Sequence, residues 1–278
     1  MIDHVTIAGR ELKALEAAFA AAGLPATYGG AHSNGITHMS IVGFADGSYV
    51  ELISTLSPGD PSPLWARHMA TAGSPSAWCV GTPDLTGQVS QLTSRGVAVR
   101  GPVPYTRTRN DGVVLEWDVA FLDEGEPGAV LPFLIQDRTD RALRVQPSEA
   151  VTASGVAGVA AVVIGCKDVK ATATRFAKAY GWPDVSTSTQ VDDASLELRL
   201  LRVVGKPLIL AQPLGAASWL ARRLERFDES PCAFLLRSDN WRDSESRLRF
   251  SARSTWFGET AHWLRLPDLP DVRIGVVR

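Results

Sequence analysis

The stretch Ile2-Asp3-His4-Val5-Thr6-Ile7-Ala8 has the composition of a buried strand that one imidazole interrupts. A second apolar run, Ser48-Tyr49-Val50-Glu51-Leu52-Ile53, is interrupted in the same way by one carboxylate. Moving an ionised carboxylate into an apolar interior is costly unless the group is paired or coordinated. Glu51 therefore needs a partner, and His4 is the obvious candidate.

The segments between these strands predict a β-α-β-β-β unit. A helix is expected from Arg10 to Ala22, closed by Gly23 and Pro25, followed by extended chain and a hairpin. The unit recurs: the run of residues 159–168, apolar up to Cys166, leads into a helix that ends at Tyr180-Gly181-Trp182-Pro183, with the same Gly and Pro. The shared helix exits indicate a duplicated module.

A second kind of module begins with a Ser-Pro strand. The first copy starts at Ser74-Pro75 and the second at Ser230-Pro231, and each follows a helix that contains Trp, Leu, Ala and Arg. The modules thus alternate as two similar halves. We expect an α+β protein of two similar domains, residues 1–140 with the candidate site and residues 155–278, separated by the polar stretch 137–155.

Composition narrows the class of protein. The chain has 278 residues, is 45% hydrophobic and 21% charged, and carries a formal net charge of −2. It can bury one large core or two ordinary ones, and the duplication favours two. No Lys/Arg-rich run interleaves with aromatics, which argues against a nucleic-acid partner. No apolar run approaches a membrane span and no secretory signal is evident, so we expect no membrane partner and a cytoplasmic location. Cys79, Cys166 and Cys232 lie in or beside apolar strands and are expected to be buried thiols.

The Asp46-Gly47 turn decides whether a second histidine joins the site. If these two residues form the whole loop, Val42 faces Glu51 and the period of two puts His38 on the face of Glu51. A three-residue loop instead turns His38 away. We favour the two-residue loop slightly, and we expect His32 to be a solvated loop residue.

These residues resemble the vicinal oxygen chelate superfamily of glyoxalases, bleomycin resistance proteins and extradiol dioxygenases. The resemblance rests on the paired β-α-β-β-β modules, on Asp3-His4-Val5 and Tyr49-Val50-Glu51-Leu52, and is closest to the glyoxalase-like branch. That branch also shows features like Gly29-Gly30, Asn110-Asp111-Gly112 with Trp117, and Phe133-Leu134-Ile135-Gln136. The resemblance implies cupped mixed sheets, with metal ligands on the first and fourth strands of a module.

By that resemblance, His4 and Glu51 are candidate ligands of a divalent ion (Zn, Fe, Mn or Ni), with His38 as the third. The alternative is that His4 is a buried histidine hydrogen-bonded to Glu51 without a metal. A site of two histidines and one carboxylate needs three protein ligands. Aligning the second module with the first places Trp78 and Phe133 where its ligands would stand. This aromatic pair is a candidate for an apolar pocket wall, and the alternative for Trp78 is a place in the core. No Gly-rich phosphate loop occurs, and no nucleotide cofactor is expected.

Arg107 and Arg109 alternate with threonines before a predicted turn, so both point to one face. On an edge strand that face is normally solvated, but over a cavity the two guanidinium groups would bind an anion. Trp117 is expected to line the same cavity.

Two functions follow. The first is an enzyme of the lyase, isomerase or dioxygenase kind, acting on a small carbonyl or vicinal-oxygen substrate, in which Glu51 and His4 are catalytic. The alternative is a binding protein that sequesters a small molecule without turning it over. The second half lacks every candidate ligand and is expected to serve packing or the pairing of two copies in a homodimer.

Overall fold

The computed structural model describes residues 1–109, 111–182, 186–191 and 197–278, and Asn110 and Pro183 of the motifs above lie outside them. The strands of the first half are β1 (Ile2–Ala8), β2 (Thr27–Ala31), β3 (Thr37–Gly43), β4 (Tyr49–Thr55), β5 (Ser74–Gly81), β6 (Val99–Thr108), β7 (Val114–Leu122) and β8 (Phe133–Asp137). Its helices are α1 (Leu12–Ala21), α2 (Ala66–Met69) and α3 (Leu85–Ser94). Two short helices, α4 (Arg141–Arg144) and α5 (Glu149–Ala153), follow.

The second half repeats this order. Its strands are β9 (Val156–Gly165), β10 (Ser186–Val191), β11 (Leu198–Val203), β12 (Leu208–Pro213), β13 (Ser230–Ser238), β14 (Phe250–Trp256), β15 (Glu259–Leu264) and β16 (Ile274–Val277). Its helices are α6 (Val169–Tyr180), α7 (Trp219–Phe227) and α8 (Trp241–Arg247).

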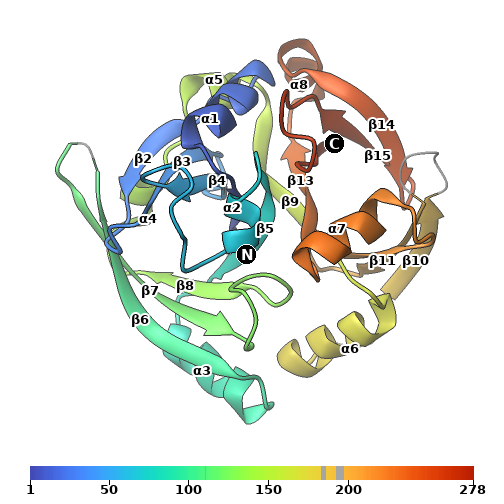
Figure 1. The fold of residues 1–278 in the computed structure, drawn as a ribbon, viewed down its shortest axis with the longest axis horizontal. Coiled ribbons are helices and arrows are strands. Elements are labelled where there is room, and N and C mark those ends of the chain that lie inside the picture. Colours follow the sequence, from blue (N-terminus) through green and yellow to red (C-terminus); the bar gives the residue numbers. More distant parts are fainter. Residues whose placement is uncertain (110, 183–185, 192–196) are drawn as a thin grey trace.

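Each half forms one curled, mixed sheet of eight strands (Figure 1), and the two strand orders correspond: β2-β3-β4-β1-β5-β8-β7-β6 and β10-β11-β12-β9-β13-β16-β15-β14. In the first sheet β1 runs parallel to β4 and antiparallel to β5, so two β-α-β-β-β modules meet at the centre. The predicted α+β fold of paired modules in two similar halves is confirmed.

The helix boundaries follow the local sequence. The helix expected over residues 10–22 spans Leu12–Ala21, and Gly23 beyond it has φ +96°, which favours glycine. Asp84 caps α3 by accepting a hydrogen bond from the backbone N–H of Gly87. Gly23 thus marks the end of α1, and Asp84 marks the start of α3.

The two sheets pack through their convex faces. Trp78 on β5 lies against Phe176 on α6, with ring centroids 6.2 Å apart. At one end of this interface the backbone N–H of Arg249 donates to the carbonyl of Ala22, and at the other Arg95 donates to the carbonyl of Ala179. One large apolar cluster therefore contains residues of both halves. The division into domains 1–140 and 155–278 stays a prediction.

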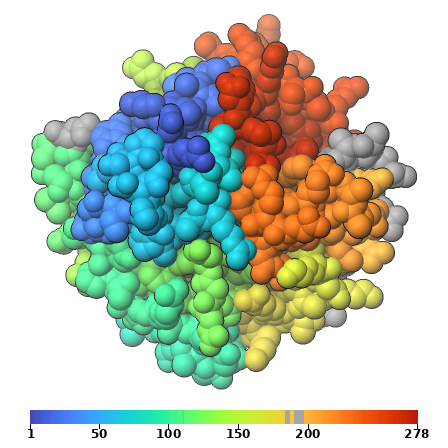
Figure 2. All heavy atoms as spheres, in the orientation of Figure 1, coloured from blue at the N-terminus to red at the C-terminus, as the bar shows by residue number. Residues whose placement is uncertain are grey.

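A polar contact also joins the halves at the β3–β4 turn. The N–H of Asp46 donates to the carbonyl of Ala157, and the N–H of Val159 donates to the hydroxyl of Ser48. Asp46 in turn accepts hydrogen bonds from the backbone and side chain of Ser48. In the space-filling view, the first half (blue to green) and the second (yellow to red) meet along a continuous boundary (Figure 2).

The concave faces carry separate apolar clusters. In the first half this cluster includes Met39, Tyr49, Trp117 and Phe133. In the second it includes Ile209, Leu220, Trp256 and Trp263. Of the polar residues predicted for the site, His4, Glu51 and Arg107 lie on the concave side of the first sheet. No helix in the described part of the chain is long and apolar enough to cross a membrane.

Candidate functional site

A cavity of about 90 Å³ opens in the concave face of the first sheet. Most of its wall is apolar and aromatic, and its polar residues are two histidines, Glu51, two arginines, Asn34 and Thr37. The lining residues are His4, His32, Asn34, Thr37, Met39, Tyr49, Glu51, Ile53, Leu64, Trp65, Tyr105, Arg107, Trp117, Val119, Phe121, Phe133, Ile135 and Arg144. A space of this size suits a small molecule.

A β-bulge in β1 brings two neighbouring polar side chains to one side. Ile2 pairs with Val80 and His4 pairs with Cys79, so Asp3 is the extra residue between them. Side chains normally alternate along a strand, and a bulge changes the direction in which one of them points. The Asp3 carboxylate consequently accepts a hydrogen bond from its own neighbour, His4 Nδ1, at 2.7 Å.

Asp3 is held ionised although it is buried. Burial by itself would raise the pKa of Asp3, but the Arg144 guanidinium and the hydrogen bond to His4 outweigh that effect and hold the pKa well below its usual range. An ionised carboxylate only accepts hydrogen bonds. The proton on the His4 ring therefore lies on Nδ1, and Nε2 is directed into the cavity towards Glu51.

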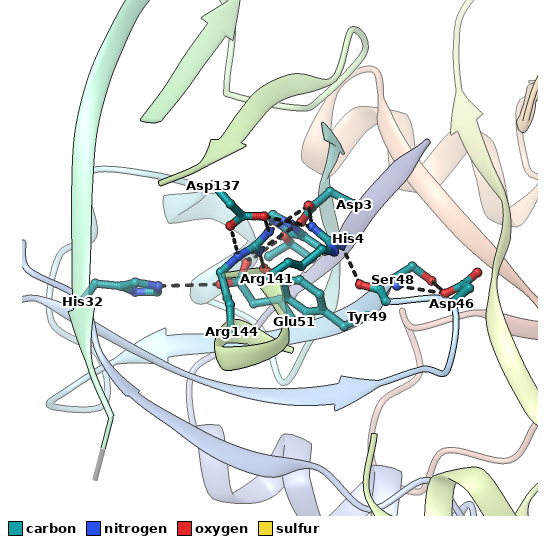
Figure 3. Close-up of polar contacts among 12 residues, drawn as sticks. Asp3, His4, His32, Asp46, Ser48, Tyr49, Glu51, Asp137, Arg141 and Arg144 are labelled. Atoms are coloured by element: carbon teal, nitrogen blue, oxygen red, sulfur yellow. Dashed lines mark hydrogen bonds and ion pairs between the residues drawn. The ribbon is translucent and has the colours of Figure 1, made fainter. Parts of the chain in front are cut away.

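The linker between the two halves, residues 137–155, supplies the two arginines that surround Asp3 (Figure 3). Arg144 on α4 donates to both oxygens of Asp3, at 3.1 and 2.9 Å, and also bonds Asp137 and the Tyr49 hydroxyl. Arg141 bonds Asp3, Asp137 and the carbonyl of Gly47. The Tyr49 ring stacks on His4 with centroids 4.6 Å apart. His4 is thus fixed on its ring face and at Nδ1, and neither arginine was predicted as part of the site.

Glu51 lies at the centre of the polar end of the cavity. It is 6% exposed, and its Oε2 accepts a hydrogen bond of 2.9 Å from the Thr6 hydroxyl. His4 Nε2 lies 3.9 Å from Oε2, and His32 Nε2 lies 3.7 Å from Oε1. The predicted pairing of His4 with Glu51 in one cavity is therefore seen in the structure.

The prediction for His38 is wrong, because the turn has three residues. The N–H of Phe44 bonds the carbonyl of Ser48, so the loop is residues 45–47, and Ile41 stands opposite Glu51. His38 consequently points away from the cavity and lies against Tyr28, with ring centroids 6.0 Å apart. Burial lowers its pKa, although Glu16 acts in the opposite sense.

His32 takes the place that was predicted for His38. It was expected to be a solvated loop residue, but it extends β2, forms an isolated bridge with Arg107 and points at Glu51 (Figure 3). Burial lowers its pKa more than the nearby Glu51 raises it, so its ring is neutral near pH 7. The signal available in the sequence was Asn34, which accepts hydrogen bonds from the N–H groups of Ile36 and Thr37 and closes the turn after His32.

Trp78 does not line the cavity, and this prediction is also wrong. Trp78 is opposite Val5 on the convex face, where it packs on Phe176 and donates its indole N–H to the carbonyl of Val130. The residue next to it, Cys79, pairs with His4 and faces the concave side. A slip of one residue in the alignment exchanged the two faces of the strand. Phe133 and Trp117 do line the cavity.

Arg107 on β6 and Arg109 just beyond the end of the strand lie in different surroundings. Arg107 is 3% exposed, lines the cavity, and donates to the carbonyl of Gly29 and to Met39 Sδ. A Cβ at position 29 would overlap both of these side chains, which explains the glycine there. Arg109 lies outside the cavity and pairs with Asp111 at 2.7 Å. Of the two predicted arginines, the structure thus places only Arg107 at the cavity.

A divalent ion is the cofactor that the resemblance implies, and the cavity holds donor atoms of suitable kinds. Two imidazoles and one carboxylate are typical ligands of catalytic transition-metal sites. The hydrogen bond from His4 Nδ1 to Asp3 is the arrangement found behind metal-binding histidines. By donor chemistry, His4, Glu51 and His32 fit a divalent ion.

The spacing requires small movements before three atoms reach one ion. Ligand atoms around a tetrahedral zinc lie about 3.4 Å apart, whereas Glu51 is 3.9 Å from His4 and 3.7 Å from His32. In the described part of the chain, the one set of three whose ligand atoms lie within 4.8 Å of one another is Asp3, His4 and Cys79. Two arginines already bond Asp3 in that set, which disfavours a further cation there.

Comparison with known structures finds the same fold at low identity. A hypothetical protein from Staphylococcus aureus has a TM-score of 0.60 and 13% identity, covering 99% of this chain and 98% of that one. A variant of 4-hydroxymandelate synthase from Streptomyces coelicolor has a TM-score of 0.63 and 13% identity, with coverage of 99% and 91%. The Mn(II)-bound glyoxalase from Novosphingobium aromaticivorans has a TM-score of 0.57 and 11% identity, with coverage of 99% and 81%.

No curated protein matches the chain. A family model described as a glyoxalase-like domain does match, over residues 2–181, which is more than half of the sequence. With the paired modules and the concave site, this match shows that the chain belongs to the glyoxalase-like family of the vicinal oxygen chelate superfamily.

Proposed function

We propose that this protein is an enzyme that moves a proton next to a carbonyl group of a small oxygenated substrate, with Glu51 as the base. The observation that carries the proposal is the placing of Glu51: a buried carboxylate in a small aromatic cavity, between two imidazoles and without an arginine or lysine ion pair among the described residues. A structural carboxylate in an apolar sheet is normally paired with a cation.

The two oxygens of Glu51 differ in what they can do. Oε2 already accepts the hydrogen bond from Thr6, so Oε1, on the side of His32, is the oxygen available to take a proton. The proton removed from the substrate carbon would form an O–H bond at Oε1, and the electron pair of the broken C–H bond would move towards the carbonyl oxygen. Returning the proton to the same or another atom would complete an isomerisation, and loss of a leaving group would complete a lyase reaction.

His4 would act on the substrate oxygen through a cation bound at Nε2. Because Nδ1 carries the proton bonded to Asp3, Nε2 presents a lone pair to the cavity, which can bind a cation or accept a hydrogen bond. A divalent ion held by His4 and His32 would supply a Lewis acid that polarises the carbonyl, and Glu51 would act as the base when it is free of coordination. Exclusion of water by the aromatic wall strengthens every charge interaction inside the cavity.

The alternative, a binding protein of the bleomycin-resistance type, has one observation in its favour. Cys79 and Phe133 occupy the positions on β5 and β8 that pair with His4 and with each other, so the second module adds no imidazole or carboxylate to the cavity. Such a protein would bind a small molecule against the aromatic wall and leave its bonds unchanged.

Deuterium exchange distinguishes these functions. Small carbonyl compounds are incubated with the protein in D₂O, with and without added Mn²⁺, Ni²⁺, Zn²⁺ or Fe²⁺, and loss of the proton next to the carbonyl is followed by ¹H NMR. Metal content of protein purified without a His tag is measured in parallel. For a substrate that exchanges, Glu51→Gln should slow exchange by roughly 10²–10⁴-fold, the usual contribution of a general base.

Glu16→Gln is the matched control, since Glu16 accepts a 2.6 Å hydrogen bond from Ser40 and lies outside the cavity. It should leave exchange unchanged. Binding of a compound by the parent protein without exchange, under every metal condition, would reject the enzyme and support the binding protein.

A further inference from the structure

Arg107 separates the inner cavity from a second hollow. An outer groove of about 280 Å³ lies beyond it, lined by Tyr28, Ile41, Leu143 and Arg109 among others. Arg107 and Arg144 line both spaces. A guanidinium group in this position is the boundary that a ligand passing from the groove to the cavity would meet.

Among the described residues, Arg107 differs from the other arginines around the site in forming no ion pair with a carboxylate. Arg144 and Arg141 pair with Asp3 and Asp137, and Arg109 pairs with Asp111. Arg107 bonds a carbonyl oxygen and a thioether sulfur, and no carboxylate among the described residues forms an ion pair with it. Its burial lowers its pKa, which reflects the cost of a cation held away from water.

Burying a charge without an ion-pair partner is unfavourable unless a ligand of opposite charge binds to it. An unpaired guanidinium in a cavity wall is the usual device for binding a carboxylate, because its parallel N–H groups match the two carboxylate oxygens. A single arginine suits a singly charged anion of small size. A phosphate dianion would call for further donors or a metal ion, and Arg144 is already occupied by two carboxylates.

The position of Arg107 also relates it to Glu51. His32 and Arg107 are opposite one another in the sheet, and His32 Nε2 lies 3.7 Å from Glu51 Oε1. Arg107 and Glu51 attract each other across the cavity. A carboxylate bound to Arg107 would therefore place neighbouring carbon atoms of the same molecule beside the oxygen that is free to take a proton.

We propose that the ligand of this cavity is a small carboxylic acid with an aromatic or apolar body, and that Arg107 binds its carboxylate. The body lies against the aromatic wall formed by Tyr105, Trp117, Phe121 and Phe133. This assignment rests on the proposed function for the identity of the site, and it specifies the substrate class of that site.

The test compares two probes that differ in charge and little in shape, phenylacetate and phenylacetamide, by isothermal titration calorimetry on the full chain. The parent protein should bind the anion at least about tenfold more tightly than the amide. Arg107→Met should remove this preference and keep the affinity for the amide. Arg107→Lys, which keeps the charge without the paired N–H groups, should retain part of it.

Arg109→Met is the matched control and should change neither affinity by more than about twofold, because Arg109 is paired and lies outside the cavity. Circular dichroism checks that each variant is folded. Equal affinity of the parent for the two probes, absence of binding, or an unchanged preference in both Arg107 variants would overturn the proposal.

The outcome for the carboxylate is separable from that for the base. Glu51→Gln should keep the preference for phenylacetate, since the Arg107 contact remains, while it slows proton exchange. A protein that exchanges protons of neutral carbonyl compounds but shows no preference for the anion would refute the Arg107 assignment alone. A protein with the preference and no exchange would refute the Glu51 assignment alone.

Discussion

The two concave faces of this molecule have the same strand order and opposite contents. The first contains a cavity with a carboxylate, two imidazoles and a buried arginine. The second is filled by an apolar cluster that includes Leu220 of α7 and two tryptophans. The helix that lies on the second face has nine residues, whereas its counterpart α2 has four.

The corresponding strands show which residues of the second half stand in the places of His4 and Glu51. β1 ends at Ala8, paired with Ile53, and β9 ends at Gly165, paired with Ala211. Counting back from these ends, Ala161 corresponds to His4 and Ile209 corresponds to Glu51. Ile209 is 1% exposed and belongs to the second concave cluster.

The comparison teaches that the fold does not require the site. An apolar concave face is sufficient to hold a paired-module sheet together, so the polar groups of the first face are an addition that lowers stability unless they are paired. The predictions that follow test this difference, from the largest expected effect to the smallest.

Ile209→Glu transfers the carboxylate of the first half to the second. No imidazole or hydroxyl awaits it at Ala161 or its neighbours, so we expect a loss of about 5 kcal/mol in the free energy of unfolding. The reciprocal change, Glu51→Leu, should cost less than about 1 kcal/mol or should stabilise the protein. Urea unfolding followed by circular dichroism measures both. Equal costs of the two changes would show that the halves tolerate charge alike.

Arg144→Met removes the main counter-ion of Asp3 in the first half. An uncompensated carboxylate, 1% exposed, would remain, and we expect a loss of about 4 kcal/mol in the free energy of unfolding. Adding Asp3→Asn to this variant should recover at least half of the loss, because the buried charge is then absent. A double variant as unstable as Arg144→Met alone would mean that the arginine acts through packing on Tyr49 instead.

His68 on α2 meets α7 of the second half, and its burial predicts a dependence on pH. Its ring stacks on Phe227 with centroids 4.5 Å apart, and burial, with Arg223 and Arg67, lowers its pKa to about 3. In the unfolded chain His68 takes up a proton below about pH 6.5. The unfolded state thus binds more protons between these values, and stability falls as the pH drops from about 6.5 towards 3.

The contribution of His68 is at most about 1.4 kcal/mol per pH unit. His68→Gln should reduce the pH slope of the unfolding free energy, measured by urea titration at pH values between those limits, by up to this amount. An unchanged slope would show that other groups account for the acid sensitivity.

Much of the fold followed from the sequence because it depends on local patterns. Apolar runs of strand length, Gly and Pro at helix exits, and the recurrence of both defined the modules and their order. The pairing of His4 with Glu51 could be predicted in the same way, because each is the isolated polar side chain of a buried strand. Two of the aromatic wall residues, Trp117 and Phe133, were identified instead from the family resemblance and the alignment of the two modules.

The rest of the site depends on contacts between distant segments. The bulge at Asp3 leaves no mark on strand composition, yet it directs Asp3 towards Arg144. The turn at Asp46 has three residues. In this turn the N–H of Asp46 bonds the carbonyl of Ala157 in the other half, and its carboxylate accepts a hydrogen bond from Ser48. The polar linker suggested a simple connection, but its Arg141 and Arg144 form part of the site. A cytoplasmic location and a homodimer remain predictions.

The return of the linker to the first sheet has a consequence for how the protein is made. No side chain that lines the cavity lies beyond residue 144, so the site can assemble before the second half is complete. The convex face is incomplete at that stage, because Phe176, which packs against Trp78, belongs to the second half. A ribosome-bound first half would therefore bind its ligand while its apolar convex face is still exposed. A ligand present during translation would stabilise that intermediate.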